Sequence, residues 1–347
     1  MTRPAVATST LAARVALVAL GLALLSACGG EAGRTQTTLV LYNGQHPQTT
    51  DSLVAAFERQ TGIQVVVRSN DEDVLADQIV LEGAASPADL IYTENSPALE
   101  YLQSKNLLAT VPRSTLAHVA AKYNSPASRW VGVSARVSVL VYNTKMLTPS
   151  QLPTSVLSLA DPRWKGLLGI APGETDFQPI ITSIVRQYGR AAALKWLNGV
   201  KANAGQHLYP DNETITSRVN SGQIAIGIIN HYYWYRLRAE VGSSQMDSAI
   251  AYFAPRDAGY VIDVSGAAVL KSSKHRQAAE RFLAFLVSRQ GQEILAHSES
   301  FEYPLGSGVV TAKGLRPFAS LQPAPLTIAE LGDGAEAVSL LHQSQLL

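Results

Sequence analysis

The sequence has one cysteine, Cys28, in 347 residues. A lone thiol excludes an intrachain disulfide and any zinc or iron–sulfur site built on paired cysteines. Charge is also scarce, at 16% of residues, and 28 lysines and arginines nearly balance 27 aspartates and glutamates. That balance gives no electrostatic argument for a nucleic-acid partner. The seven histidines are scattered and form neither HxxxH nor HExxH.

Long apolar runs are absent except near the N-terminus. Residues 15–25 carry no charge and follow two arginines, but about 20 apolar residues are needed to span a bilayer. The run therefore predicts a secretory signal. It ends in Leu-Ser-Ala-Cys, which resembles a bacterial lipoprotein signal. We predict a signal peptide over residues 1–27, lipidation of Cys28 and a tether over residues 28–37; an ordinary signal peptide beside a coincidental cysteine is the alternative.

The remaining chain is long enough for roughly two domains of about 150 residues. Short apolar stretches alternate with segments whose apolar residues recur at helical spacing, which predicts an α/β fold. In the first half, up to residue 107, the alternation predicts a largely parallel sheet. The expected strands are residues 38–42, 63–67, 88–92, 167–171, 224–229 and 249–253. The expected helices are residues 50–60, 71–83, 97–107 with Ser96 as N-cap, 178–200 with a break at Gly189, 213–221 with Asn212 as N-cap, 232–241 and 274–296.

Two β-rich runs, residues 130–142 and 260–270, are too long for ordinary strands. They are expected to cross between two α/β lobes, which is the plan of a type II periplasmic binding protein with its ligand in a cleft and the crossings as hinges. The predicted lobes are residues 38–135 with 265–310, and residues 136–264 with 311–347.

Four side chains follow predicted strands and are expected at the cleft, because ligands of open α/β sheets bind beyond the carboxyl ends of the strands. They are His46, Glu94, Tyr232 and Tyr233. Two phenolates and one carboxylate are hard anionic oxygen donors that suit Fe³⁺ and balance its charge, and the imidazole adds a nitrogen. The phenols must be ionised by the metal, because their ordinary pKa is near 10.

Each of these signals also has an ordinary structural explanation. The Tyr-Tyr-Trp-Tyr segment at residues 232–235 could pack against the core or stack on a sugar. His46 could be a surface or capping residue, and Glu94 a solvated carboxylate at a helix start.

Several segments together carry a resemblance to a known family. They are Leu-Tyr-Asn-Gly-Gln-His (41–46), Ser-Pro-Ala-Asp (86–89), Tyr-Thr-Glu-Asn-Ser-Pro-Ala-Leu (92–99), Trp-Lys (164–165), Ala-Leu-Lys-Trp-Leu (193–197), Asn-His-Tyr-Tyr-Trp (230–234) and Ser-Gly-Ala-Ala-Val-Leu-Lys-Ser-Ser (265–273). The chain resembles the ferric-ion-binding proteins of bacterial iron ABC importers, whose bilobal fold is like one transferrin lobe. The resemblance implies that His46, Glu94, Tyr232 and Tyr233 are iron ligands. It also places Asn95, Asn212 and Asn230 near the family's bound anion.

The chain departs from this family at residues 173–176. Related proteins often have small residues there that hold a phosphate, whereas this sequence has Gly-Glu-Thr-Asp. Glu174 and Asp176 would repel a phosphate, and Arg136 on the first crossing would offset one negative charge if it points into the cleft. We therefore expect carbonate, water or Glu174 itself in place of phosphate; the alternative is that Glu174 and Asp176 point to solvent.

These observations predict a monomeric, lipid-anchored solute-binding protein at the outer face of the cytoplasmic membrane or in the periplasm. It would capture Fe³⁺ and deliver it to an ABC importer permease. The alternative is the same fold binding a polyamine, thiamine or sugar on the Tyr-Tyr-Trp wall. An enzyme that uses Glu94 with Glu174 or Asp176 as a carboxylate pair on a glycoside has no further motif in its favour.

Overall fold

The computed structural model describes residues 1–2 and 37–347. Residues Thr37–Leu347 form one compact unit. Residues 3–27 of the predicted signal peptide, Cys28 and nearly all of the tether lie outside the described residues. Within the described part, no helix has the length and apolar character needed to cross a membrane.

The first half of the compact unit contains three parallel strands connected by helices. β1 (Thr38–Gly44) lies between β2 (Gln64–Ser69) and β3 (Leu90–Thr93) and pairs with both in parallel. Two helices, α2 (Pro47–Thr61) and α3 (Glu72–Glu82), make the connections. Proline in the first turn of α2 suits its beginning, and Gly62 ends it in a left-handed conformation with φ 71°. The predicted α/β alternation is confirmed here.

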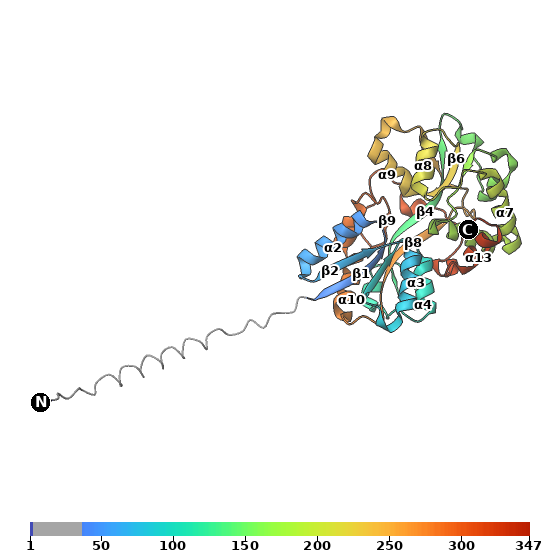
Figure 1. The fold of residues 1–347 in the computed structure, drawn as a ribbon. Helices are drawn as coiled ribbons and strands as arrows, with labels where there is room; N and C mark the ends of the chain where they lie inside the picture. The colour runs from blue at the N-terminus through green and yellow to red at the C-terminus, as the bar shows by residue number, and fades with distance from the viewer. Residues whose placement is uncertain (3–36) are drawn as a thin grey trace. The chain divides into compact units, whose positions relative to one another are not determined.

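The long strand β4 (Val131–Asn143) pairs with different strands in its first and second halves. Its first half, Val131 to Val137, pairs with β8 (Ile262–Val269), which also pairs with β3. From Ser138 onward it pairs with β6 (Ile226–Asn230). All thirteen residues of β4 are buried, including the polar Ser134, Arg136, Ser138 and Asn143. In Figure 1, β4 and β8 lie between the blue-to-cyan elements and the green-to-yellow elements.

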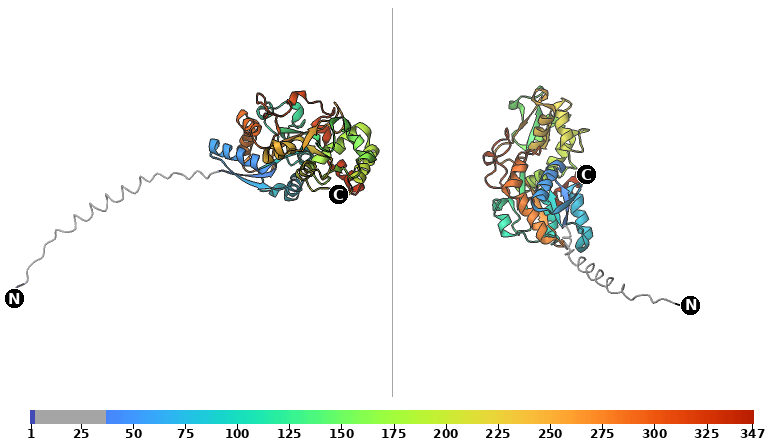
Figure 2. Two further views of the ribbon diagram at one scale, coloured as in Figure 1. Left: turned by 90° about the horizontal axis from the view of Figure 1, so that it is seen from above. Right: turned by 90° about the vertical axis from the view of Figure 1, so that its left-hand side faces the viewer.

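The complete strand order is β2-β1-β3-β8-β4-β6-β5. Two further strands, β7 (Ser248–Ala251) and β9 (Tyr303–Pro304), pair with β4 outside this path. Helices pack around the strands, as the two further views in Figure 2 show. The other elements are β5 (Leu168–Gly169), α4 (Ser96–Ser104), α5 (Arg113–Leu116), α6 (Gln178–Tyr188), α7 (Arg190–Ala204), α8 (Asn212–Asn220), α9 (His231–Val241), α12 (Ile328–Leu331) and α13 (Ala335–Gln343).

The sequence-based helix caps are wrong by one residue in two places. Helix α4 begins at Ser96, so Asn95 takes the N-cap position, and the Ser96 hydroxyl is engaged elsewhere. Helix α8 begins at Asn212, and its cap is the Asp211 carboxylate, which accepts from the Thr214 amide at 2.6 Å. In both cases two consecutive residues can cap a helix, and tertiary contacts decide between them.

The segment predicted as one helix over residues 274–296 is two helices. α10 (Arg276–Leu286) ends before Ser288, and α11 (Arg289–Ala296) begins after it. The Ser288 hydroxyl accepts from the Gly291 amide at 3.2 Å and caps the second helix. The apolar spacing continues across this break, so periodicity alone did not reveal it.

Candidate metal centre

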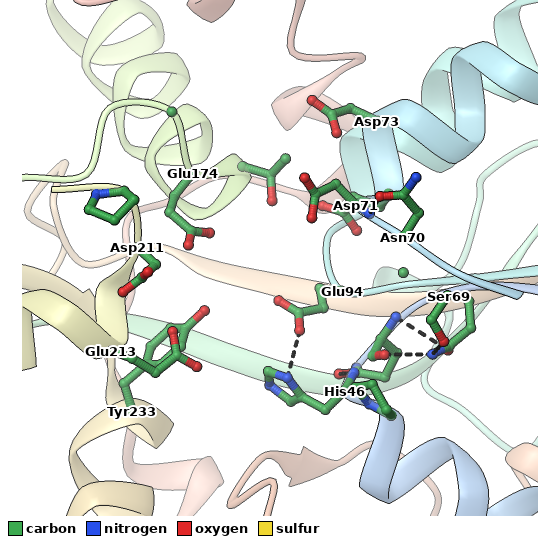
Figure 3. Close-up of a pocket in the computed structure, with 18 residues that line it drawn as sticks. His46, Ser69, Asn70, Asp71, Asp73, Glu94, Glu174, Asp211, Glu213 and Tyr233 are labelled. Carbon is green, nitrogen blue, oxygen red and sulfur yellow. Dashed lines mark hydrogen bonds and ion pairs between the residues drawn. The ribbon is translucent and has the colours of Figure 1, made fainter.

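A cavity of about 530 Å³ lies beyond the ends of β1 and β3 and beside the start of α9. Among the described residues that line it, none is a lysine or arginine. Figure 3 shows carboxylates reaching toward the cavity from several loops and helix starts. The seven that line it are Asp71, Glu72, Asp73, Glu94, Glu174, Asp211 and Glu213. Such a lining favours a cationic ligand.

His46 and Glu94 are in contact on one side of this cavity. The His46 Nδ1 lies 2.9 Å from Glu94 Oε1, as the dashed line in Figure 3 shows. The His46 Nε2 is buried and has no partner among the described residues. Burial alone would raise the pKa of Glu94, but the His46 charge and hydrogen bond and the Arg136 charge outweigh it and hold the pKa at about 2. Burial likewise lowers the pKa of His46, but the Glu94 charge and hydrogen bond raise it overall.

Tyr232 and Tyr233 approach the same point from the first turn of α9. The Tyr232 hydroxyl lies 3.4 Å from Glu94 Oε2 and 3.4 Å from Asp176 Oδ2. The two phenol rings lie 4.1 Å apart, and the His46 ring meets Tyr232 edge-on at 5.2 Å. Burial first, and then the neighbouring carboxylates, raise the pKa of both phenols well above the ordinary value. Only a strongly charged cation would ionise them here.

Asp176 is buried and does not point to solvent. Its carboxylate accepts from the Asn95 amide at 3.0 Å and from the Asn212 amide at 3.1 Å, and a hydrogen bond from Asn230 lowers its pKa. Burial nevertheless raises the pKa of Asp176 overall. The three asparagines expected beside an anion are therefore brought together around a carboxylate of the chain itself.

Glu174 lines the cavity and is partly buried. Burial and the charges of Asp176 and Glu94 raise its pKa to about 9. Glu174 and Asp176 therefore do not both point to solvent, which was the alternative expectation for segment 173–176.

Arg136 lies next to two of the candidate ligands, Glu94 and Tyr232, and is completely buried. Its guanidinium lies 3.4 Å from Glu94 Oε2 and 3.9 Å from Asp176 Oδ1, and it forms an ion pair with Glu302. It also lies 5.3 Å from the centre of the Tyr232 ring. The positive charge of Arg136 is thus shared among carboxylates of the chain.

Sequence reasoning missed Glu302 and Glu72. Glu302 is buried, pairs with Arg136, and accepts from Gln45 at 3.3 Å. Glu72 is buried and accepts from the Asn95 backbone amide at 2.8 Å, and burial raises its pKa to about 8. An acidic residue at the start of a helix is ordinary, and residue 302 follows no predicted strand, so neither gave a signal.

The described ranges 1–2 and 37–347, this site included, contain no group of three or more histidine, cysteine, aspartate or glutamate side chains arranged to hold a metal ion. A metal at this cavity would therefore depend on the phenol oxygens as well as on His46 and Glu94.

The comparisons with known proteins agree with this geometry. Residues 85–323 match the family described as bacterial extracellular solute-binding protein. The chain belongs to this family. This solute-binding protein is 38% identical over 333 residues to the Fe(3+)-binding periplasmic protein of Serratia marcescens, covering 96% of this chain and 97% of that one. It is 38% identical over 324 residues to the major ferric iron-binding protein of Neisseria meningitidis, covering 93% and 97%.

A solved structure supports the same placement. Iron-bound HitA from Pseudomonas aeruginosa is 42% identical, with a TM-score of 0.85 over 89% of this chain and 99% of that chain. The predicted resemblance to the ferric-ion-binding proteins is confirmed, and so is the fold class of two α/β lobes joined by two strand crossings. The relatives are named as binding proteins, which agrees with the expectation that this chain is not an enzyme.

Proposed function

We propose that this solute-binding protein captures Fe³⁺ between its two lobes, with His46, Glu94, Tyr232 and Tyr233 as ligands. The observation that carries the proposal is the meeting of a carboxylate, an imidazole and a phenol pair at the edge of an acidic cavity. Hard anionic oxygens are the donors that a small trivalent cation prefers. The names of the relatives support iron as the cargo.

The decisive experiment is a ferric titration of the purified protein, with iron supplied as a weak chelate. Phenolate bound to Fe³⁺ gives a visible charge-transfer band, so the protein is expected to turn red to purple with one iron per chain. The paired variants Tyr232→Phe and Trp234→Phe separate a ligand from a neighbouring aromatic residue, because the Tyr232 hydroxyl lies 3.4 Å from Glu94 whereas the Trp234 indole donates to the Ser248 carbonyl. A colourless wild type without tight iron binding would refute the proposal.

We further propose that iron binding here does not require phosphate. The position near Asn95, Asn212 and Asn230 holds Asp176, and Glu174 lies close to it at the cavity. The negative charges of Asp176 and Glu94 already raise the pKa of Glu174, and a phosphate would add further negative charge beside them. The remaining coordination positions are assigned to carbonate, water or the Glu174 carboxylate.

A polyamine is the second candidate ligand, because seven carboxylates also suit an extended polycation. An aromatic wall for thiamine or a sugar has less support. The Trp234 indole donates to the Ser248 carbonyl at 3.2 Å and the Tyr235 hydroxyl to the Gly314 carbonyl at 3.0 Å, and neither ring is among the described residues that line the cavity. Calorimetry with spermidine and with a ferric chelate separates the two candidates.

We propose delivery of the iron to an ABC importer permease by a monomer held at the membrane through lipid on Cys28. The motif Leu-Ser-Ala-Cys supports the anchor. Stable anchoring needs at least two acyl chains, so diacylation or more is expected. Cys28→Ala should release the protein to the periplasm or medium, whereas an unmodified mature N-terminus at another residue would contradict the anchor.

The lobe boundaries, residues 38–135 with 265–310 and 136–264 with 311–347, also stay a proposal. The change of partner along β4 between Val137 and Ser138 supports a boundary close to residue 136. Small-angle scattering tests the hinge, since closure around iron should reduce the radius of gyration.

A further inference from the structure

His231 is a buried imidazole that the iron site does not use directly. It is the first residue of α9 and has no exposed surface. Its Nε2 lies 3.0 Å from the Phe301 carbonyl oxygen, and its Nδ1 lies 3.4 Å from the Val137 backbone amide nitrogen. A carbonyl only accepts and a backbone amide only donates, so one neutral tautomer, with the proton on Nε2, satisfies both contacts.

The two backbone groups that His231 contacts belong to the junction of the lobes. Val137 is the last residue of β4 that pairs with β8, and Ser138 is the first that pairs with β6. Phe301 precedes Glu302, the partner of Arg136, and β9, which pairs with Ser134 and Ala135 of β4. The imidazole therefore links helix α9 of one lobe to the strand crossing and to a segment on the other lobe.

Two further observations show that this arrangement is tightly determined. The His231 ring stacks on the Tyr303 ring at 4.7 Å with only 17° between the planes. Phe301 has a φ of 53°, an uncommon value for a residue with a side chain, which persists only where the surroundings determine it. The Phe301 carbonyl thus has a fixed direction, and it points at the imidazole.

We propose that His231 is a positioning residue that fixes the first turn of α9 against the hinge, so that the phenols of Tyr232 and Tyr233 are already in place for the metal. The proposal rests on the proposed ferric site. Without the two contacts, the first turn of α9 would be free to shift in the iron-free protein, and iron binding would have to order it.

Substitution of His231 is expected to lower the affinity for iron and to change the visible absorption of the iron-bound protein. His231→Phe keeps a ring to stack on Tyr303 but removes both hydrogen bonds. Two buried hydrogen bonds predict a loss of iron affinity of roughly 10- to 100-fold, a faster iron release and a shifted or weakened phenolate band. His231→Gln keeps a donor for the Phe301 carbonyl but loses the Val137 contact. The logarithm of its iron affinity should therefore fall by roughly half as much as that of His231→Phe.

The test compares these variants with wild type by competitive ferric titration, visible absorption and thermal melting. The control His207→Phe removes an imidazole that contacts Tyr209 and does not line the cavity. Lower melting temperatures with wild-type affinity and an unchanged band in both His231 variants would show a structural role only and overturn the proposal.

If His231→Phe does not fold, a wild-type iron affinity and an unchanged band in His231→Gln would overturn the proposal in the same way. A wild type that binds no iron rejects the proposed function itself, which is a different outcome from iron binding that His231 does not affect.

Discussion

Removal of the buried cation Arg136 is expected to destabilise the iron-free protein strongly. The guanidinium is completely buried and pairs with Glu302, and it lies 3.4 Å from Glu94 and 3.9 Å from Asp176. Arg136→Met keeps much of the side-chain volume but leaves these carboxylates without their cation. Removing one partner of a buried ion pair costs on the order of 3–5 kcal/mol. For a protein of this size, that corresponds to a fall in melting temperature of roughly 5–8 °C.

The double variant Arg136→Met with Glu302→Gln is the matched control. It removes the cation together with the carboxylate that it pairs with, so the uncompensated buried charge is smaller, and a large part of the lost stability should return. Iron adds a further distinction. Because Fe³⁺ supplies positive charge beside Glu94, saturating iron should raise the melting temperature of Arg136→Met by more than it raises that of the wild type.

Thermal melting of the four states, wild type and Arg136→Met with and without iron, measures both effects. A single variant whose melting temperature lies within about 2 °C of wild type would show that the carboxylates find other compensation, such as protonation or water. An iron-induced shift no larger than that of wild type would show that the metal does not lie next to these charges.

Three further predictions concern the same region. Tyr233→Phe should abolish or shift the visible band and weaken iron binding by orders of magnitude, whereas His46→Ala should weaken binding less, because it leaves both phenolates; equal losses in a competitive titration would contradict this order. Glu72 has its pKa raised to about 8 by burial, so the folded protein binds a proton that the unfolded chain releases near its ordinary value of 4.5. Stability of the iron-free protein should therefore fall between about pH 4.5 and pH 8, and denaturant unfolding of Glu72→Gln should show a weaker fall; an identical pH dependence would refute the shift. Wild-type iron affinity should not depend on phosphate, and in Glu174→Ser it should depend on phosphate to the same degree or more. If the wild type requires phosphate and Glu174→Ser requires it equally, the Glu174 carboxyl group is irrelevant to the choice of anion.

The sequence was sufficient to predict the alternation of strands and helices, because that depends on local spacing of apolar residues. It was also sufficient to place residues 46, 94, 232 and 233 beyond strand ends, and the structure brings Tyr232 within 3.4 Å of Glu94. The division of residues 274–296 into two helices depends on the Ser288 cap, which competes with an uninterrupted apolar pattern.

The surroundings of the site were harder to predict than its candidate ligands. Glu302 and Arg136 are 166 positions apart in the chain and meet only through the pairing of β9 with β4. No periodicity or local motif reports such a contact. The inward direction of Asp176 likewise depends on amides from three separate segments.

The absence of lysine and arginine from the described lining of the cavity also has a kinetic consequence. A concave surface of one sign concentrates oppositely charged solutes and speeds their association, and at physiological salt this field extends roughly 8 Å. Positively charged iron donors should load the protein fast at low ionic strength and more slowly as salt is added, whereas neutral donors should show little dependence on salt. Anionic chelates should show the opposite trend, and stopped-flow loading at several salt concentrations would reveal it. The carboxylates that would balance the charge of the bound metal would thus also make cationic iron donors load faster than anionic chelates.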